Sequence, residues 1–138
     1  MSESQIVEQL KECFKNGNKL LICGNGGSMA QASHFAEELI THGYPAIALA
    51  DPNVISALAN DFSYEEVFSR YIIALANQGD VLIALSTSGK SKNILRAIRT
   101  AYQKHMIVID FPRDKGKTTE TIQNYQLRFL HRVYKRII

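Results

Sequence analysis

The chain has 138 residues, of which 46% are hydrophobic, and a formal net charge of +3 at pH 7. A chain of this length buries one ordinary core, so we expect a single domain over residues 1–138. The small charge does not argue for a nucleic-acid partner, and no apolar run is long enough to cross a membrane. The two cysteines, Cys13 and Cys23, lack metal-type spacing, which predicts buried, reduced thiols in a cytoplasmic protein.

Helix-like and strand-like patterns alternate along the chain without a linker. Asp51 and Pro52 have the pattern of a helix N-cap and a first-turn proline. The predicted elements are a helix around residues 6–14, a strand at 19–23, helix 28–41, strand 45–50, a helix from 51, helix 64–76, strand 81–85, helix 91–103, strand 106–110 and helix 118–136. Strands separated by helices imply right-handed crossovers and a parallel sheet covered on both faces. We therefore predict a three-layer α/β/α sandwich with about four parallel strands.

The third predicted strand ends in a loop rich in hydroxyl groups, Ser86-Thr87-Ser88-Gly89-Lys90-Ser91, and a helix follows at once. Backbone N–H groups, hydroxyl donors and the positive end of a helix dipole then surround one point, which suits a phosphate group. The spacing of the Walker phosphate loop is absent. The loop therefore favours a sugar phosphate over a mononucleotide.

The first predicted strand ends in a second small-residue loop, Gly24-Asn25-Gly26-Gly27-Ser28, which also enters a helix. A single glycine-rich turn is most often only a tight connection. In open parallel sheets, however, ligands bind beyond the carboxyl ends of the strands. Two such loops in equivalent positions indicate a joint site in which two helix N-termini face one anion.

A second constellation consists of His34, Glu38, Gln123 and His131. His34 and Glu38 lie four residues apart on a predicted helix, so they share a face and have the types of donor that bind zinc. Gln123 and His131 lie two turns apart on the last helix. Each pair alone is a weak signal, because a solvated His/Glu contact and a core histidine are the commoner explanations. His42 and His105, which have no partner at a useful spacing, are expected in loops or on the surface.

Several blocks of the chain resemble the bacterial phosphoheptose isomerases of the sugar-isomerase (SIS) superfamily, namely residues 22–28, 33–39, 60–62, 67–70 and 86–91. The resemblance implies an SIS-type, flavodoxin-like fold and a cytoplasmic enzyme. Its reaction converts sedoheptulose 7-phosphate to D-glycero-D-manno-heptose 7-phosphate through an enediol(ate), for the heptose of lipopolysaccharide or capsule. The resemblance also implies a homo-oligomer, a tetramer or a dimer, with one zinc ion per subunit.

The resemblance assigns roles to individual residues. It implies that the phosphate is bound by Ser86, Thr87, Ser88 and Ser91. It also implies that the rest of the substrate is contacted by Asn25, Gly26, Gly27, Ser28, Asn60, Asp61 and Gln123. The metal ligands are His34, Glu38, Gln123 and His131.

For the proton transfer we choose Glu38 as the base and His131 as the acid, since a carboxylate and an imidazole can work together near neutral pH. Zinc would polarise the carbonyl group. A carboxylate held tightly by zinc is a poor base, so either Glu38 leaves the metal during turnover or the role of the metal is partly structural.

The chain also departs from the family pattern. It begins about one helix later, residues 39–44 replace a longer arginine-bearing loop, and residues 111–117 stand where relatives have a glycine-rich turn and another strand. A shortened variant of this kind leaves two alternatives open. One is an isomerase of another phosphosugar, and the other is a non-catalytic SIS module that binds phosphosugars or proteins.

Overall fold

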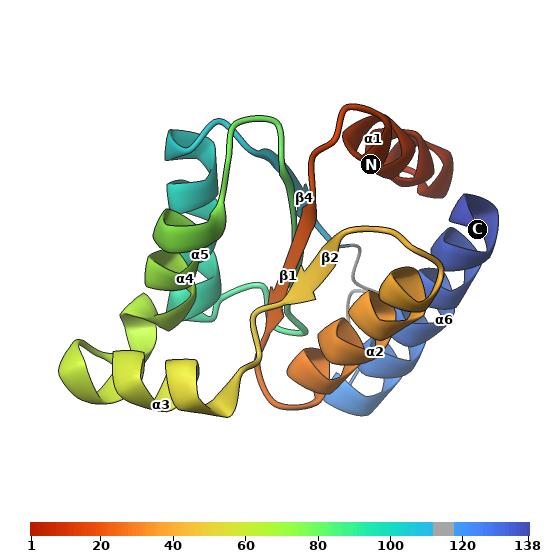
Figure 1. Ribbon diagram of the computed structural model, residues 1–138. Helices are drawn as coiled ribbons and strands as arrows, with labels where there is room; N and C mark the ends of the chain where they lie inside the picture. The colour runs from red at the N-terminus through yellow and green to blue at the C-terminus, as the bar shows by residue number, and fades with distance from the viewer. Residues whose placement is uncertain (112–117) are drawn as a thin grey trace.

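The computed structural model describes residues 1–111 and 118–138 and contains a parallel sheet between two layers of helices (Figure 1). This architecture confirms the predicted three-layer α/β/α fold. The elements are α1 (Glu3–Lys15), β1 (Leu20–Gly24), α2 (Gly27–Thr41), β2 (Ala46–Ala48), α3 (Pro52–Asp61), the 3-10 turn η1 (Tyr64–Glu66), α4 (Val67–Leu75), β3 (Val81–Leu85), α5 (Lys92–Gln103), β4 (Ile107–Asp110) and α6 (Thr119–Ile137).

The element boundaries agree closely with the prediction, with two differences. Strand β2 is shorter than expected because it pairs only with the first part of β1, from Leu20↔Ala46 to Ile22↔Ala48, before the chain turns into α3. The predicted helix 64–76 begins as a 3-10 turn and becomes α-helical at Val67. The predicted short bridge at 111–117 lies, apart from Phe111, outside the described residues.

The strand order β2-β1-β3-β4 fixes the place of a binding site. All neighbouring strands are parallel, and β1 pairs with β2 on one side and with β3 on the other. The connections that leave β1 and β3 therefore run to opposite sides of the sheet. In flavodoxin-like sheets of this order, the crevice at this switch point receives the ligand. The loops after β1 and β3 border that crevice.

Each face of the sheet has its own core. Leu20 and Ile22 of β1 pack with α1, α2 and α6, whereas Leu21 and Cys23 pack with α4 and α5. Strands β1 and β3 are buried along their whole length, as expected for parallel strands with helices on both sides. Cys13 and Cys23 are free and buried, as predicted.

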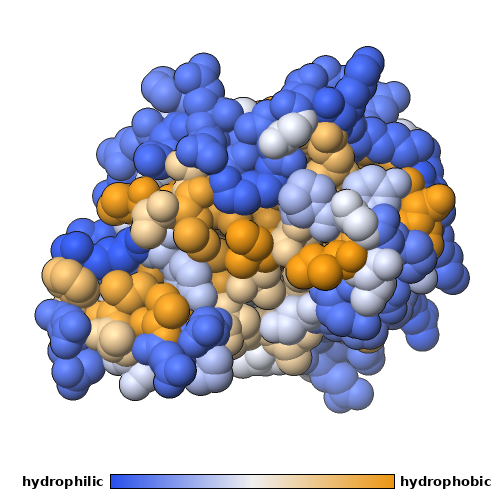
Figure 2. Space-filling view, in the orientation of Figure 1, coloured by the Kyte–Doolittle hydropathy of each residue, from blue (hydrophilic) through white to orange (hydrophobic). Residues whose placement is uncertain are grey.

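Helix α3 differs from the other α-helices because none of its residues is buried. It extends beyond the sheet below α4 in Figure 1, and hydrophobic surface gathers over it in Figure 2. Its exposed apolar groups include Val54, with Phe62 and Tyr64 next to its C-terminal end. None of the helices described here combines the length and the apolar character needed to span a membrane.

Candidate active site

A cavity of about 150 Å³ lies beyond the carboxyl ends of β1 and β3. Both predicted loops contribute to it, together with the start of α6. The lining residues are Asn25, Ser28, Leu85, Ser86, Thr87, Ser91, Thr119 and Gln123. The structure therefore brings the two small-residue loops together, as their equivalent positions predicted.

Two of the helices that begin at this cavity, α2 and α5, differ from α1, α3 and α6 in how their N-termini are capped. In α1, α3 and α6, the side chains of Ser2, Asp51 and Thr118 accept hydrogen bonds from first-turn amides. In α2 and α5, the N-cap residues Gly26 and Ser91 make no such side-chain bond. First-turn amides need acceptors, and an anion can supply them. Helix α4 also lacks a side-chain cap, but it continues from the turn η1 and none of its residues lines the cavity, so α2 and α5 are the uncapped helices that begin there.

Hydroxyl groups also shape the loop after β3. Ser86 Oγ accepts a hydrogen bond from the Gly89 amide at 3.0 Å, and Ser88 Oγ accepts one from the Lys90 amide at 3.0 Å. Gly89 takes a positive φ of 69°, which favours glycine. Of the predicted phosphate ligands, Ser86, Thr87 and Ser91 line the cavity, while Ser88 lies in the same loop without lining it.

The loop after β1 needs a glycine at its first position because α2 approaches it closely. A Cβ atom on Gly24 would lie 2.8 Å from Ser28 Cβ and 2.9 Å from the Ser28 backbone carbon. On Gly27 it would meet only the tip of the Gln123 side chain, whose nitrogen would lie 2.5 Å away. The space for a side chain at residue 24 is therefore limited by the backbone of α2, whereas at residue 27 it is limited only by the flexible side chain of Gln123.

We expect Gly24→Ala to lower the free energy of unfolding by about 1–3 kcal/mol, the usual cost of overpacking a tight site. Gly27→Ala is the matched control, because rotation of Gln123 can relieve its contact. Urea denaturation of the two variants measures the difference. Equal stability of both would show that the approach of α2 to β1 does not restrict residue 24.

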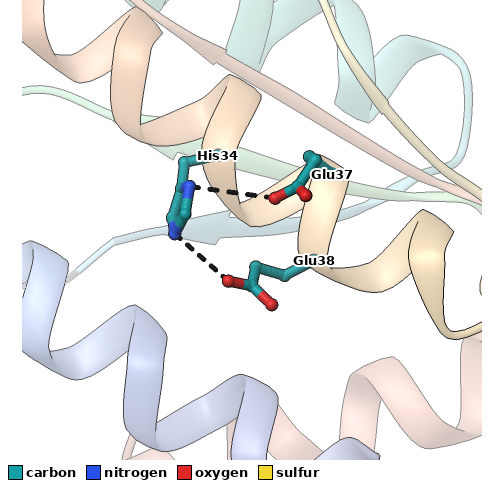
Figure 3. A group of neighbouring side chains, drawn as sticks. All are labelled: His34, Glu37 and Glu38. Carbon is teal, nitrogen blue, oxygen red and sulfur yellow. Dashed lines mark ion pairs between the residues drawn. The ribbon is translucent and has the colours of Figure 1, made fainter.

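A second, smaller groove lies between α2 and α6 and holds three of the predicted metal ligands, His34, Glu38 and His131. His34 Nε2 lies 3.3 Å from Glu38 Oε1, and the ring centroids of His34 and His131 are 5.7 Å apart. Figure 3 shows that Glu37 also approaches His34, with 3.8 Å between Oε2 and Nδ1. The packing of α6 against α2 thus brings His131 to the His/Glu pair.

The donors in and beside this groove fit a divalent metal ion. Ligand atoms of His34 and Glu38, which line the groove, and of Glu37, at its edge, all lie within 4.8 Å of one another. Gln31 lines the same groove, and its buried Oε1 has no hydrogen-bond partner in the described part of the chain. Imidazole nitrogen and carboxylate oxygen are typical zinc ligands, and an unpaired buried oxygen is costly unless something binds it.

The fourth predicted metal ligand, Gln123, lies elsewhere. Its side chain packs on Gly27 and lines the cavity, and its backbone oxygen accepts a 2.8 Å hydrogen bond from Gln31 Nε2. This bond links the cavity to the groove, because Gln31 lines the groove. Metal binding by Gln123 stays a prediction, while its place beside the predicted substrate site is clear.

Asn60 and Asp61 stand apart from both features. They are exposed at the C-terminal end of α3, where Asn60 Nδ2 donates a 3.2 Å hydrogen bond to Asp61 Oδ1. Neither lines the cavity, so their contact with sugar hydroxyls stays a prediction. His42 and His105 are exposed, as expected.

Tyr134 was not predicted from the sequence, although it follows His131 by one helical turn and lines the same groove. Desolvation raises the pKa of Tyr134, and the charge of Glu38 with a hydrogen bond to that carboxylate raises it further. The ring of Tyr134 also lies 6.3 Å from that of His131. The spacing of three residues between His131 and Tyr134 could have indicated that they share a helical face, but an aromatic residue at that spacing is usually part of a core.

Comparison with known proteins gives a consistent result. Residues 4–111 match the model of the SIS domain family. The phosphoheptose isomerase of Glaesserella parasuis is 48% identical over 129 residues, covering 88% of this chain and 67% of that protein. The phosphoheptose isomerase of Sodalis glossinidius is 48% identical over 128 residues, with 88% and 66% covered. The chain spans about two thirds of the length of these curated relatives.

The similarity extends to solved structures. The structure of phosphoheptose isomerase GmhA from Neisseria gonorrhoeae matches with a TM-score of 0.94 at 33% identity, covering 98% of this chain and 84% of that one. The match includes both layers of helices and the sheet, since nearly the whole chain is covered.

Proposed function

Since the chain belongs to the phosphoheptose isomerase family of SIS-domain proteins, we propose that it converts sedoheptulose 7-phosphate to D-glycero-D-manno-heptose 7-phosphate. The observation that carries the proposal is the cavity at the switch point of the sheet, where α2 and α5 begin without side-chain caps. The groove that holds Glu38 and His131 is linked to it by the bond from Gln31 to Gln123.

The separation of these two features suits a long sugar phosphate. Gly27 begins α2 at the cavity, and His34 follows seven residues later in the groove, which corresponds to about 10 Å at 1.5 Å per residue. An extended seven-carbon chain has a comparable length. The phosphate can therefore bind at Ser86, Thr87 and Ser91 while the carbonyl end reaches Glu38.

Glu38 would remove a proton from C1, next to the C2 carbonyl group, and the electron pair would form an enediolate across C1 and C2. His131 would supply a proton to C2, and the proton of the C1 hydroxyl would pass to O2, which gives the aldose with its carbonyl at C1. General acid–base catalysis of this kind contributes about 10²–10⁴-fold to a rate. Both side chains line one groove, so they can act on neighbouring carbons.

We also propose one zinc ion per subunit, held by His34, Glu38, His131 and Gln123. The donors of the groove and the unpaired Gln31 Oε1 support a metal there, and Gln123 would have to turn from Gly27 to join them. When bound, zinc would polarise the substrate carbonyl group. Stoichiometric zinc in the purified protein, reduced in a His34→Ala variant, is the expected result of metal analysis.

We further propose a cytoplasmic homo-oligomer, a tetramer or a dimer, that serves heptose synthesis for surface polysaccharide. The exposed apolar side chains on and beside α3 support a contact between copies, and the two free thiols suit a reducing compartment. Light scattering of the purified protein is expected to give a mass of two or four chains.

The substrate is tested by incubating the protein with zinc and a panel of ketose phosphates of five to seven carbons, with NMR detection of the aldose. We expect sedoheptulose 7-phosphate to be the best substrate. Turnover of a shorter ketose phosphate alone would favour an isomerase of another phosphosugar. The absence of any turnover would favour a non-catalytic binding module.

A further inference from the structure

The two loops of the cavity are joined by a reciprocal pair of side-chain amides. Asn25 Nδ2 donates to Asn93 Oδ1 at 2.9 Å, and Asn93 Nδ2 donates to Asn25 Oδ1 at 2.8 Å. Asn25 belongs to the loop after β1, and Asn93 is the second residue of α5. Asn93 is buried, with 4% of the residue exposed, while Asn25 is half-buried, so the pair is partly shielded from water, which strengthens its hydrogen bonds.

A third group completes the arrangement. The Tyr64 hydroxyl, from the 3-10 turn η1, donates to the same Asn25 Oδ1 at 2.9 Å. Asn25 Oδ1 therefore accepts two hydrogen bonds, which is the full capacity of an amide oxygen. Within the described chain, Asn25 Nδ2 uses one of its two N–H groups on Asn93, so a second N–H remains for a ligand in the cavity.

The orientation of this amide matters because its two ends have opposite polarity. An amide oxygen turned toward a bound phosphate would repel it, whereas an N–H would donate to it. Turning the Asn25 amide alone would place its Nδ2 against Asn93 Nδ2 and its Oδ1 against Asn93 Oδ1, and it would give up the acceptor of the Tyr64 hydroxyl. The present orientation of Asn93 and the Tyr64 hydroxyl therefore hold the Asn25 oxygen away from that role. The same bonds hold the start of α5 at a set position relative to the loop after β1.

We propose that Asn93 and Tyr64 are positioning residues for phosphate binding, which act by fixing the Asn25 amide with an N–H toward the cavity. The proposal rests on the proposed function only in taking the ligand to be a phosphate group. Asn25 then donates a hydrogen bond to the phosphate, and its orientation is set by residues of α5 and η1.

The test measures binding of inorganic phosphate by calorimetry, without turnover. Tyr64→Phe removes one hydroxyl from a half-exposed ring and is expected to weaken phosphate binding about 3–10-fold, the effect of one modest hydrogen bond. Asn93→Ala is expected to weaken it further. Tyr102→Phe, an exposed tyrosine on α5, is the matched control and is expected to bind phosphate as the parent chain does.

The decisive comparison places both changes in an Asn25→Ala background. Residues that act through Asn25 have no further effect there, so the double variants should bind phosphate as weakly as Asn25→Ala alone. For the sugar phosphate, Tyr64→Phe is expected to raise KM with little change in kcat. A parent chain that binds no phosphate, an unchanged affinity in Tyr64→Phe, or additive losses in the double variants would each overturn the proposal.

The phosphate-binding experiment can succeed or fail independently of the test of the proposed reaction. A chain that binds phosphate with this dependence but converts no ketose phosphate would refute the isomerase while the positioning role stands. If Asn93→Ala fails to fold, Tyr64→Phe alone and in the Asn25→Ala background still decides the question.

Discussion

Replacement of Glu38 by Gln is expected to lower kcat for the ketose–aldose conversion by about 10²–10⁴-fold. The substitution keeps the size of the side chain but removes the carboxylate that we propose as the acceptor of the C1 proton. Glu38 lies 3.3 Å from His34 and lines the groove with His131, and among the described residues no second carboxylate lines that groove. The rate is measured at saturating substrate, so that weaker binding does not enter.

Glu37→Gln is the matched control for this experiment. Glu37 is the next residue on α2 and also approaches His34, but it is more exposed and does not line the groove. We expect it to lower kcat less than tenfold, far less than a general base contributes. The zinc content of both variants separates loss of the metal from loss of the base. A larger loss in Glu37→Gln than in Glu38→Gln, at equal zinc content, would show that the base is wrongly assigned.

The largest expected effect on stability follows from Asp80, at the opposite end of the sheet from the cavity. Its buried carboxylate accepts hydrogen bonds from Lys19 Nζ at 2.6 Å, the Asn77 amide at 2.7 Å and Asn18 Nδ2 at 2.9 Å. Asp80→Ala would leave these donors without their acceptor and a partly buried ammonium without its partner. We expect a loss of about 3–5 kcal/mol in the free energy of unfolding, measured by urea denaturation.

The same carboxylate predicts a dependence on pH. Burial raises the pKa of Asp80, but the hydrogen bonds from Lys19, Asn77 and Asn18 outweigh it and hold the pKa below 3.8. A lowered folded-state pKa means that the contribution to stability is complete above about pH 4 and is lost as pH falls through the folded pKa. The stability difference between the parent chain and Asp80→Ala should therefore shrink below that pH. A constant difference would contradict the assignment.

The fold could be predicted from sequence because its signals are local. Short apolar runs marked β1 and β3, helical spacing marked α2 and α5, and Asp51-Pro52 marked the start of α3, whose cap the structure confirms. The joint cavity was also predictable, since loops after parallel strands meet at one edge of the sheet.

The rest of the site depends on contacts between residues far apart in sequence. Asn25 and Asn93 are 68 residues apart, and Asn25 and Tyr64 are 39 apart, so no spacing rule connects them. The exclusion of Gln123 from the groove depends on how its side chain packs against Gly27. Glu37 and Gln31, in contrast, share the helical face of His34, but polar residues at that spacing are common on exposed helices.

The central claim is that this chain moves a proton between two carbons of a seven-carbon ketose phosphate. The most direct measurement is conversion of sedoheptulose 7-phosphate in D2O with zinc present, followed by NMR of the product. The proton that His131 delivers to C2 exchanges with solvent before it is transferred, so we expect an aldose 7-phosphate that carries deuterium at C2. Formation of no aldose, or of an aldose with only hydrogen at C2, would contradict it.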